Sequence, residues 1–383
     1  MALPEASVSS APVGVGFIGV GMISDTYLEN LGSFPDVRVV ILGDLDLDRA
    51  RAQAEKHGVP ESGTVDEVLA HPEVQVIVNL TIPAVHAEVS SRAIAAGKHV
   101  WTEKPIGLDR ASTSALLTQA DAAGLRVGVA PDTVLGPGLQ TAKRAIESGL
   151  IGTPLFATTS MQWQGPDLMH PNPSFLFARG GGPLFDFGPY YFTALVNLFG
   201  SISRVGALGL RGREERVVRV GPQAGQTFPV EVPSTISVLT QFAAGQQAQN
   251  LLSFDSAVSR HGVFEVNGTE GTIVIPDPNT FDGRIAYVKP FTEMPTSFPF
   301  EQQWIEVEQE GVVVGRGLGL LEMVRAIAEG RPHRANGDVG YHVLDVMLSA
   351  EESAERGEFV AVESTVADIP AMPVDFDPFA RTV

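Results

Sequence analysis

The sequence predicts a two-part protein: an α/β N-terminal domain on a parallel sheet, then an α+β C-terminal domain with a large open, mainly antiparallel sheet. Over residues 13–131, apolar strand-like runs alternate with helical segments, as in parallel sheets with crossover helices. A glycine-rich turn, Gly19-Val-Gly21, follows the first apolar run. From residue 155 onward, strand-like runs follow one another with few helices between them.

The glycine-rich turn is a G-x-G-x-x-S version of the dinucleotide-binding fingerprint and predicts that the first domain is a Rossmann domain. Gly19 would allow the tight turn, and Gly21 would let the backbone approach a pyrophosphate without a Cβ in the way. The helix predicted from Met22 would direct its first N–H groups, including that of Ile23, toward the phosphates. Ser24 replaces the third glycine of the fingerprint.

A second apolar run, Val37–Leu42, ends in Gly43 and Asp44. An acidic residue at this distance from the turn is typical of a carboxylate that binds the adenosine ribose hydroxyls. Asp44 would repel a 2′-phosphate, so NAD is favoured over NADP, although Arg49 is close enough to complicate the choice. The alternative is a strand–turn–helix without a ligand, in which Asp44 caps the helix.

Polar residues also follow the later strands of this domain. The run Val74–Leu80 ends in Thr81-Ile-Pro83, with His86 at the start of the next helix, and the run 99–101 leads into Glu103-Lys104-Pro105. Ligands of open α/β sheets lie beyond the carboxyl ends of the strands, so these tips converge on one edge. The expected cofactor-binding residues are Gly19, Gly21, Met22, Ile23, Asp44, Thr81, Pro83, His86, Glu103 and Lys104.

Composition excludes several classes of function. The net charge of −19 over 383 residues argues against nucleic acid or an anionic membrane as a partner. The chain has no cysteine, and its eight histidines show no short ligand spacing, so no metal site is expected. No apolar run approaches the length of a membrane span, and residues 1–12 resemble a flexible tail, not a signal peptide. A cytoplasmic enzyme is expected.

The second domain, residues 132–383, is expected to bind substrate and to mediate oligomerisation. Its strands are predicted at 156–163, 204–210, 216–220, 234–242, 246–253, 261–267 and 271–275, and its later helices at 318–329 and 339–356. Helices would cover one face of such an open sheet, and a partner subunit would cover the other. A homodimer or homotetramer is therefore expected.

Four segments together resemble the Gfo/Idh/MocA family of NAD(P)-dependent oxidoreductases. They are the glycine turn, Thr81-Ile-Pro83 with His86, the run Ala96-Gly-Lys-His-Val-Trp-Thr-Glu-Lys-Pro105, and Gly180–Tyr191. The resemblance implies a Rossmann domain, a second domain with an open antiparallel sheet, and dimers or tetramers formed sheet to sheet. It also implies hydride transfer between nicotinamide and a secondary alcohol carbon of a sugar, cyclitol or glycoside.

By the same resemblance, the catalytic residues are Lys104, Asp186 and Tyr190. Lys104 would contact the reacting hydroxyl and stabilise a developing alkoxide. Tyr190 matches the acid/base position, which is usually histidine but is tyrosine in the glucose–fructose oxidoreductase and dihydrodiol dehydrogenase branches. A phenol acts as a base only beside a cation, which Lys104 would supply. If the segment is helical, Asp186 would share a helix face with Tyr190. The alternative role of Asp186 is a helix cap, and that of Tyr190 is a packed aromatic side chain.

Trp163, His170 and Asn172, together with the three catalytic residues, are expected to bind substrate, with core packing as the alternative for Trp163. Two other functions keep the same fold. One is a tightly held NAD that is reduced and reoxidised within a single catalytic cycle, as in glycoside cleavage or transhydrogenation. The other is an NAD-binding regulator without catalysis, against which the retention of all three catalytic residues argues.

Overall fold

The computed structural model describes residues 11–293, 296 and 298–383, so nearly all of the predicted tail at residues 1–12 lies outside the described residues. The chain forms two compact units. The first contains residues 11–135, 314–340 and 375–383, and the second contains residues 136–313 and 341–374. Sequence analysis predicted one change of domain near residue 131, whereas the chain returns to the first unit twice.

The first unit is built on a six-stranded parallel sheet in the order β3-β2-β1-β4-β5-β6. This order confirms the predicted Rossmann domain, because two βαβ halves diverge from β1 and β4. The strands are β1 (Val13–Ile18), β2 (Val37–Gly43), β3 (Glu61–Gly63), β4 (Val76–Asn79), β5 (His99–Thr102) and β6 (Val127–Val129).

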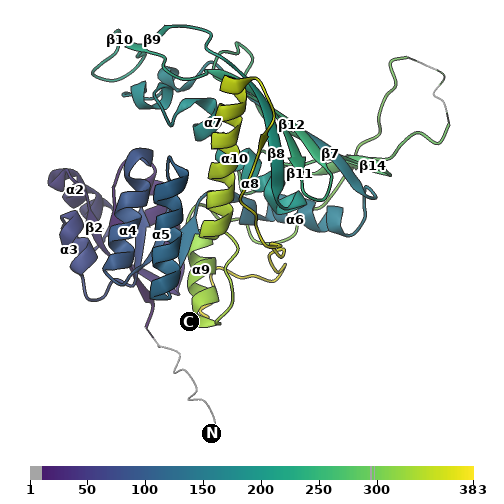
Figure 1. Cartoon of the computed structure of the whole chain (residues 1–383). Helices are drawn as coiled ribbons and strands as arrows, with labels where there is room; N and C mark the ends of the chain where they lie inside the picture. Colours follow the sequence, from purple (N-terminus) through teal and green to yellow (C-terminus); the bar gives the residue numbers. More distant parts are fainter. Residues whose placement is uncertain (1–10, 294–295, 297) are drawn as a thin grey trace. The chain divides into compact units, whose positions relative to one another are not determined.

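The helices of this unit begin and end where local signals place them. Thr64 forms a capping box with Glu67 at the start of α3, and Gly58 and Gly124 end α2 and α5 in the left-handed conformation. In Figure 1, α4 and α5 lie side by side, and they contact each other. The helices are α1 (Ser24–Leu31), α2 (Leu47–His57), α3 (Val65–Ala70), α4 (His86–Ala95), α5 (Arg110–Ala123) and α9 (Leu318–Ala328), with short 3-10 turns at Pro83–Val85 and Asp132–Leu135.

Helix α9 belongs to the first unit because its apolar face packs on β6 and on the 3-10 turn that follows it. The buried ion pair between Arg325 of α9 and Asp36 also joins this helix to the turn before β2, with Nε and Oδ2 2.8 Å apart. Helix α9 therefore covers β6, which lies almost 200 residues earlier in the sequence. No local sequence pattern predicts this contact.

The second unit contains a nine-stranded sheet in the order β16-β15-β14-β13-β7-β12-β11-β8-β17. Its neighbours are antiparallel among the described residues except for the parallel pair β7 and β12, which confirms the predicted, mainly antiparallel sheet. The strands are β7 (Pro154–Gln162), β8 (Ile202–Leu210), β11 (Thr235–Phe242), β12 (Gln247–Ser253), β13 (Arg260–Gly268), β14 (Gly271–Val274), β15 (Ala286–Val288), β16 (Ile305–Glu306) and β17 (Val360–Ala361).

Three further helices and a small hairpin complete this unit. Helix α8 (Gly188–Phe199) is buried along nearly its whole length and contacts α6 (Pro137–Glu147), while α7 (Gly182–Asp186) contacts β11 and β12. The hairpin pairs β9 (Glu215–Val217) with β10 (Thr227–Pro229). Helix α10 (Gly337–Arg356) begins in the first unit and continues in the second.

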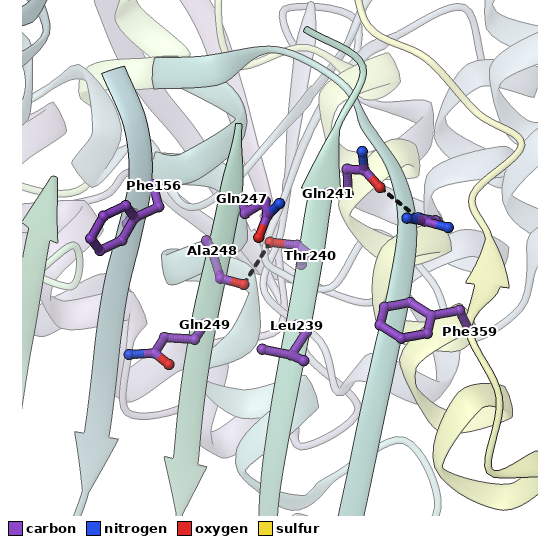
Figure 2. A pocket seen from close by; sticks show the side chains of 10 residues that line it. Phe156, Leu239, Thr240, Gln241, Gln247, Ala248, Gln249 and Phe359 are labelled. Atoms are coloured by element: carbon purple, nitrogen blue, oxygen red, sulfur yellow. Dashed lines mark hydrogen bonds between the residues drawn. The ribbon is translucent and has the colours of Figure 1, made fainter. Parts of the chain in front are cut away.

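One face of the nine-stranded sheet is exposed. Along β11 the side chains alternate, with Val238 and Thr240 buried and Leu239 exposed. Figure 2 shows Leu239, Phe156 and Phe359 together on the exposed face, with polar side chains from β11 and β12 between them. Two shallow depressions of about 290 and 390 Å³ lie on this face. This period-2 pattern is that of a sheet with one covered face.

Among the described residues, no helix combines the length and the apolar character needed to cross a bilayer.

Candidate active site

The first turn of the predicted fingerprint is fixed by the backbone. Gly19 has φ of 91°, and its N–H donates to the carbonyl of Gly43 at the end of β2, 2.8 Å away. A Cβ at this position would lie 2.8 Å from the carbonyl carbon of Leu80. Glycine is therefore required here by conformation and by close approach of the backbone after β4.

Gly21 is different, because the protein itself does not require it. Its φ lies outside the left-handed region, and a Cβ built on it would have no neighbour within 4 Å. The space in front of Gly21 is open, at the N-terminus of α1, where a pyrophosphate would be held. Ser24 is buried and donates its hydroxyl to the Gly21 carbonyl at 2.7 Å, which fixes the turn. The residues present therefore fit a dinucleotide.

Asp44 lies just beyond the end of β2, where sequence analysis placed it. Its Oδ2 accepts the backbone N–H of Val20 at 2.9 Å, and its Oδ1 accepts that of Asp46 at 3.0 Å. Burial alone would raise the pKa of this carboxyl, but the hydrogen bonds from Arg49 and from these two N–H groups outweigh it and lower the pKa. Asp44 is therefore a carboxylate that is hydrogen-bonded to the glycine turn through the N–H of Val20.

His86 joins two of the predicted strand tips. Its Nδ1 lies 2.6 Å from the carbonyl oxygen of Pro105, and its Nε2 lies 2.9 Å from that of Thr81. The side chain is buried, and burial lowers its pKa, an effect that the two carbonyl oxygens partly offset. Thr81 donates its hydroxyl to Asn79 at 2.7 Å, and Pro83 begins the 3-10 turn. Direct contact of these residues with the cofactor stays a prediction.

A buried chain of hydrogen bonds fixes the segment that carries Lys104. Glu103 Oε2 accepts the backbone N–H of Lys104 at 3.1 Å, and its Oε1 accepts the hydroxyl of Tyr27 at 2.9 Å. The indole of Trp101 donates to the same hydroxyl at 3.2 Å. Burial raises the pKa of Tyr27 well above its usual value, so the phenol stays protonated and donates to Glu103.

Asp186 and Tyr190 do not lie on one continuous helix. Asp186 is the last residue of α7, and α8 begins at Gly188, with the backbone turning at Phe187. The break follows from Pro189, which has no N–H to donate and restricts the residue before it. Tyr190 is 6% exposed, whereas Asp186 is half-buried. Phe187, between the two helices, keeps right-handed helical backbone angles, so a shared face for Asp186 and Tyr190 stays a prediction.

An aromatic cluster surrounds this break and includes the predicted Trp163. The ring of Trp163 lies 6.5 Å from that of Phe187, which in turn lies 6.2 Å from that of Tyr190. Phe254 packs edge-on against Trp163, with ring planes at 86°. The exposed ring of His261 lies 5.9 Å from Trp163 and 6.0 Å from Phe187. These distances are typical of offset or edge-to-face ring pairs.

His170 and Asn172 lie on a separate loop between two short 3-10 turns, Pro166–Leu168 and Ser174–Phe177. Within this loop the Asn172 N–H donates to Nδ1 of His170 at 3.0 Å. The base of the loop is fixed by Arg216 of the β9–β10 hairpin, which is 3% exposed and donates to Asp167 at 2.7 Å and to Asp255 at 2.6 Å. Asn172 itself is exposed.

Sequence reasoning did not single out three residues that the structure places around these positions: Tyr27, Arg216 and His261. The burial of Tyr27 has a signal in the sequence, because it lies on the apolar face of a predicted helix with Leu28 and Leu31. Arg216 and His261 lie on strands that give no sign of what they contact, since their partners are distant in sequence.

A buried Ser–His–Asp group elsewhere in the second unit is structural. His342 Nε2 accepts the N–H of Ile202 at 2.9 Å, and Nδ1 lies 2.8 Å from the hydroxyl of Ser364. That hydroxyl donates to Asp345 at 2.7 Å. Because Nε2 already accepts the N–H of Ile202, the neutral ring donates from Nδ1 to the Ser364 hydroxyl. The imidazole therefore cannot take the proton of that hydroxyl, which is donated to Asp345 instead.

Two family models match this chain. Residues 13–130 match the oxidoreductase family with an NAD-binding Rossmann fold, and residues 139–274 match the GFO/IDH/MocA C-terminal domain. An uncharacterized oxidoreductase of Rhizobium meliloti is 30% identical over 267 residues, which are 69% of this chain and 74% of that protein. The chain belongs to the Gfo/Idh/MocA family. It is an NAD-binding oxidoreductase, as the sequence predicted.

Two further proteins are similar to this chain, one in sequence and one in structure. Trans-1,2-dihydrobenzene-1,2-diol dehydrogenase of Macaca fuscata fuscata is 27% identical over 266 residues, 69% of this chain and 74% of that enzyme. Levoglucosan dehydrogenase in its apo form has a TM-score of 0.80 and 22% identity, covering 92% of this chain and 99% of that one. The same enzyme has been solved in complex with NADH and levoglucosan.

Proposed function

We propose that the protein is an NAD-dependent dehydrogenase that oxidises a secondary alcohol carbon of a sugar, cyclitol or glycoside. The proposal is supported chiefly by Lys104, Asp186 and Tyr190, which occupy the family's catalytic positions in a chain whose cofactor turn fits a dinucleotide. The relatives add support, because a dihydrobenzenediol dehydrogenase and a levoglucosan dehydrogenase are both named for hydroxylated ring compounds.

In the proposed step the carbinol carbon loses its hydrogen as a hydride and becomes a carbonyl carbon, while its hydroxyl loses a proton. NAD⁺, held at the glycine turn, would supply the hydride acceptor. Tyr190 takes the proton, and the ammonium group of Lys104 stabilises the oxygen as negative charge develops on it. Asp186 accepts a hydrogen bond from a substrate hydroxyl. The reverse direction uses the same groups with the proton moving from Tyr190 to the oxygen.

For the substrate we assign Trp163 and His261 to one binding surface. An indole ring offers an apolar face to the C–H groups of a sugar ring, and an exposed imidazole can donate or accept a hydrogen bond. His170 and Asn172 would contact the more distant part of the substrate from their loop. This arrangement suits a hydroxylated ring with one apolar face.

The test is NADH formation when the purified protein and NAD⁺ are mixed with a panel of sugars, cyclitols, glycosides and cyclic diols, with Lys104→Ala as the control. A signal with one substrate class that disappears in the variant would support the dehydrogenase. Failure of every substrate would contradict it. NADH or NAD⁺ that stays with the protein through gel filtration, together with that failure, would indicate the internally recycled cofactor.

We also propose that a second copy of this chain covers the exposed face of the nine-stranded sheet. Leu239 and Phe156 are both about half exposed there, and Leu208, on β8, is 76% exposed. In a self-complementary contact, this apolar centre would pack against the same centre of the second copy. The surrounding glutamines and Arg204 would pair with polar groups of the second copy. Sedimentation should show a dimer or tetramer for the wild type and a monomer for Leu239→Glu. Val312→Glu, at an exposed apolar residue outside this face, should not change the assembly; an unchanged Leu239→Glu oligomer would contradict the proposal.

A further inference from the structure

The carboxylate predicted to bind the adenosine ribose is already paired with a cation. Arg49 Nη2 lies 2.6 Å from Asp44 Oδ1, and Arg49 Nε lies 3.3 Å from Asp44 Oδ2. The two N–H groups thus reach both oxygens of one carboxylate, a fork that only arginine can make. Asp44 is 7% exposed and Arg49 is 50% exposed, so the carboxylate is fixed and the guanidinium faces solvent.

The hydrogen-bond capacity of Asp44 is filled by this arrangement. A carboxylate offers about four acceptor positions. The N–H groups of Val20 and Asp46 occupy one on each oxygen, and the two N–H groups of Arg49 occupy the others. The first two are backbone groups of neighbouring turns and cannot leave without unfolding those turns. Ribose hydroxyls can therefore bind Asp44 only where Arg49 donates now.

The position of Arg49 on its helix gives a second, independent indication. Asp46 is the N-cap of α2, and its side chain accepts the backbone N–H of Arg49 at 3.1 Å, which places Arg49 in the first turn. A cation in the first turn opposes the helix dipole, which favours anions at that end. The helix dipole thus disfavours an arginine at this position, which its pairs with Asp44 and Asp46 offset, and an anion in front of the turn would interact favourably with both the dipole and Arg49.

We propose that Arg49 is a second residue that discriminates between the two dinucleotides, acting against Asp44. In competition with the ribose hydroxyls for the carboxylate, Arg49 weakens the binding of NAD. Toward a 2′-phosphate it supplies a positive charge and two N–H donors beside a carboxylate that would otherwise repel the phosphate. The proposal rests on the assignment of Asp44 to the ribose, and it does not depend on the identity of the substrate.

The experiment measures the dissociation constants of NADH and NADPH for the purified full chain by calorimetry, without substrate. Arg49→Met keeps the length of the side chain and removes the charge and the donors. We expect Arg49→Met to bind NADH about threefold to fivefold more tightly, because an exposed pair of this kind has a modest strength. NADPH should bind about tenfold more weakly, because a charge-assisted bond to phosphate is lost.

Arg51→Met is the matched control. Arg51 lies on the same helix, pairs with Asp48 at 3.0 Å and is similarly exposed, so it should leave both dissociation constants within twofold of wild type. A second variant, Arg49→Lys, keeps the charge without the fork and should retain most of the NADPH binding. Unchanged constants in Arg49→Met, or weaker NADH binding, would overturn the proposal. Because no turnover is measured, a wrong substrate class cannot produce either result.

Discussion

The cofactor side and the substrate side of this protein are constructed in different ways. In the first unit, the predicted site positions lie on turns that follow parallel strands, at Gly19, Asp44, Thr81 and Lys104. In the second unit, Tyr190 lies beside a break between two helices and packs on Phe187, whose ring contacts Trp163, Phe254 and His261. The first kind of site depends on local turns, and the second depends on packing between distant segments.

This difference determines which substitutions are informative. On the cofactor side, a change at a position that faces open space, such as Gly21, can affect binding while the fold stays intact. On the substrate side, the same residues that position Tyr190 also form the core, so function and stability change together. The following predictions test that distinction, from the largest effect to the smallest.

Lys104→Ala should give the largest loss. We expect kcat to fall by about 10²–10⁴-fold, because the cation that stabilises the developing alkoxide is removed. The dissociation constant of NADH should stay within a few-fold of wild type, because the glycine turn and Asp44 are untouched. Steady-state kinetics and calorimetry on the same preparation separate the two quantities. Full activity in the variant would remove Lys104 from the chemistry.

Arg216→Met should destabilise the second unit by about 3–5 kcal/mol, because Asp167 and Asp255 would lose their buried cation. The guanidinium of Arg216 also lies over the ring of Phe177, with its central carbon 4.8 Å from the ring centroid. Denaturant unfolding measures the free energy, and Arg211→Met, at an exposed pair with Glu214, is the control with little expected effect. A loss below 1 kcal/mol would show that the hairpin does not hold the loop.

His342→Gln should reduce the loss of unfolding free energy that the protein shows as the pH falls below neutral. Burial, partly offset by Asp345 and Ser364, lowers the pKa of His342 to about 4 in the folded protein, whereas the unfolded value is about 6.5. Between these values the unfolded state binds the extra proton, so the wild type loses stability as pH falls from 6.5 to 4. The loss amounts to about 3 kcal/mol, and the difference between wild type and variant should change by that amount. A pH-independent difference would contradict this.

Gly21→Ala should separate binding from stability most cleanly. The added Cβ meets nothing within 4 Å, so the free energy of unfolding should change by less than about 1 kcal/mol. NADH binding should weaken by about tenfold or more, because the methyl group occupies the space of the pyrophosphate. Gly19→Ala is the contrast: its φ of 91° and the Leu80 backbone predict a clear loss of stability. Equal effects of the two variants would contradict the distinction.

The sequence predicted the Rossmann domain of the first unit because the information for its strands and turns is local. Each strand of the parallel sheet is a short apolar run, and the residue that follows it in sequence also follows it in space. Thr64 and Glu67 have the three-residue spacing of a capping box and form one. Helix α9 was assigned to the wrong side of the domain boundary in this reasoning, since its place on β6 depends on packing and not on its own sequence pattern.

The substrate side was predicted by residue identity and not by geometry. Resemblance identified Asp186 and Tyr190, but the single helix expected to carry them is interrupted at Phe187. His261 precedes Gly262, which has φ of 68° at an irregularity in the pairing of β13 with β7. Such irregularities redirect a side chain, and their place in a strand depends on the partner strand.

The parallel pair β7 and β12 has a consequence for the kinetics of folding. Because these strands run in the same direction, Trp163 and Phe254 emerge at the same end of the sheet, and the Trp163 N–H donates to the Ser253 carbonyl there, 3.1 Å away. The two strands are separated by more than eighty residues of chain, and contacts of such long range form late. Refolding protein should therefore recover the fluorescence of Trp163 and its activity together, after most of the helical signal has returned.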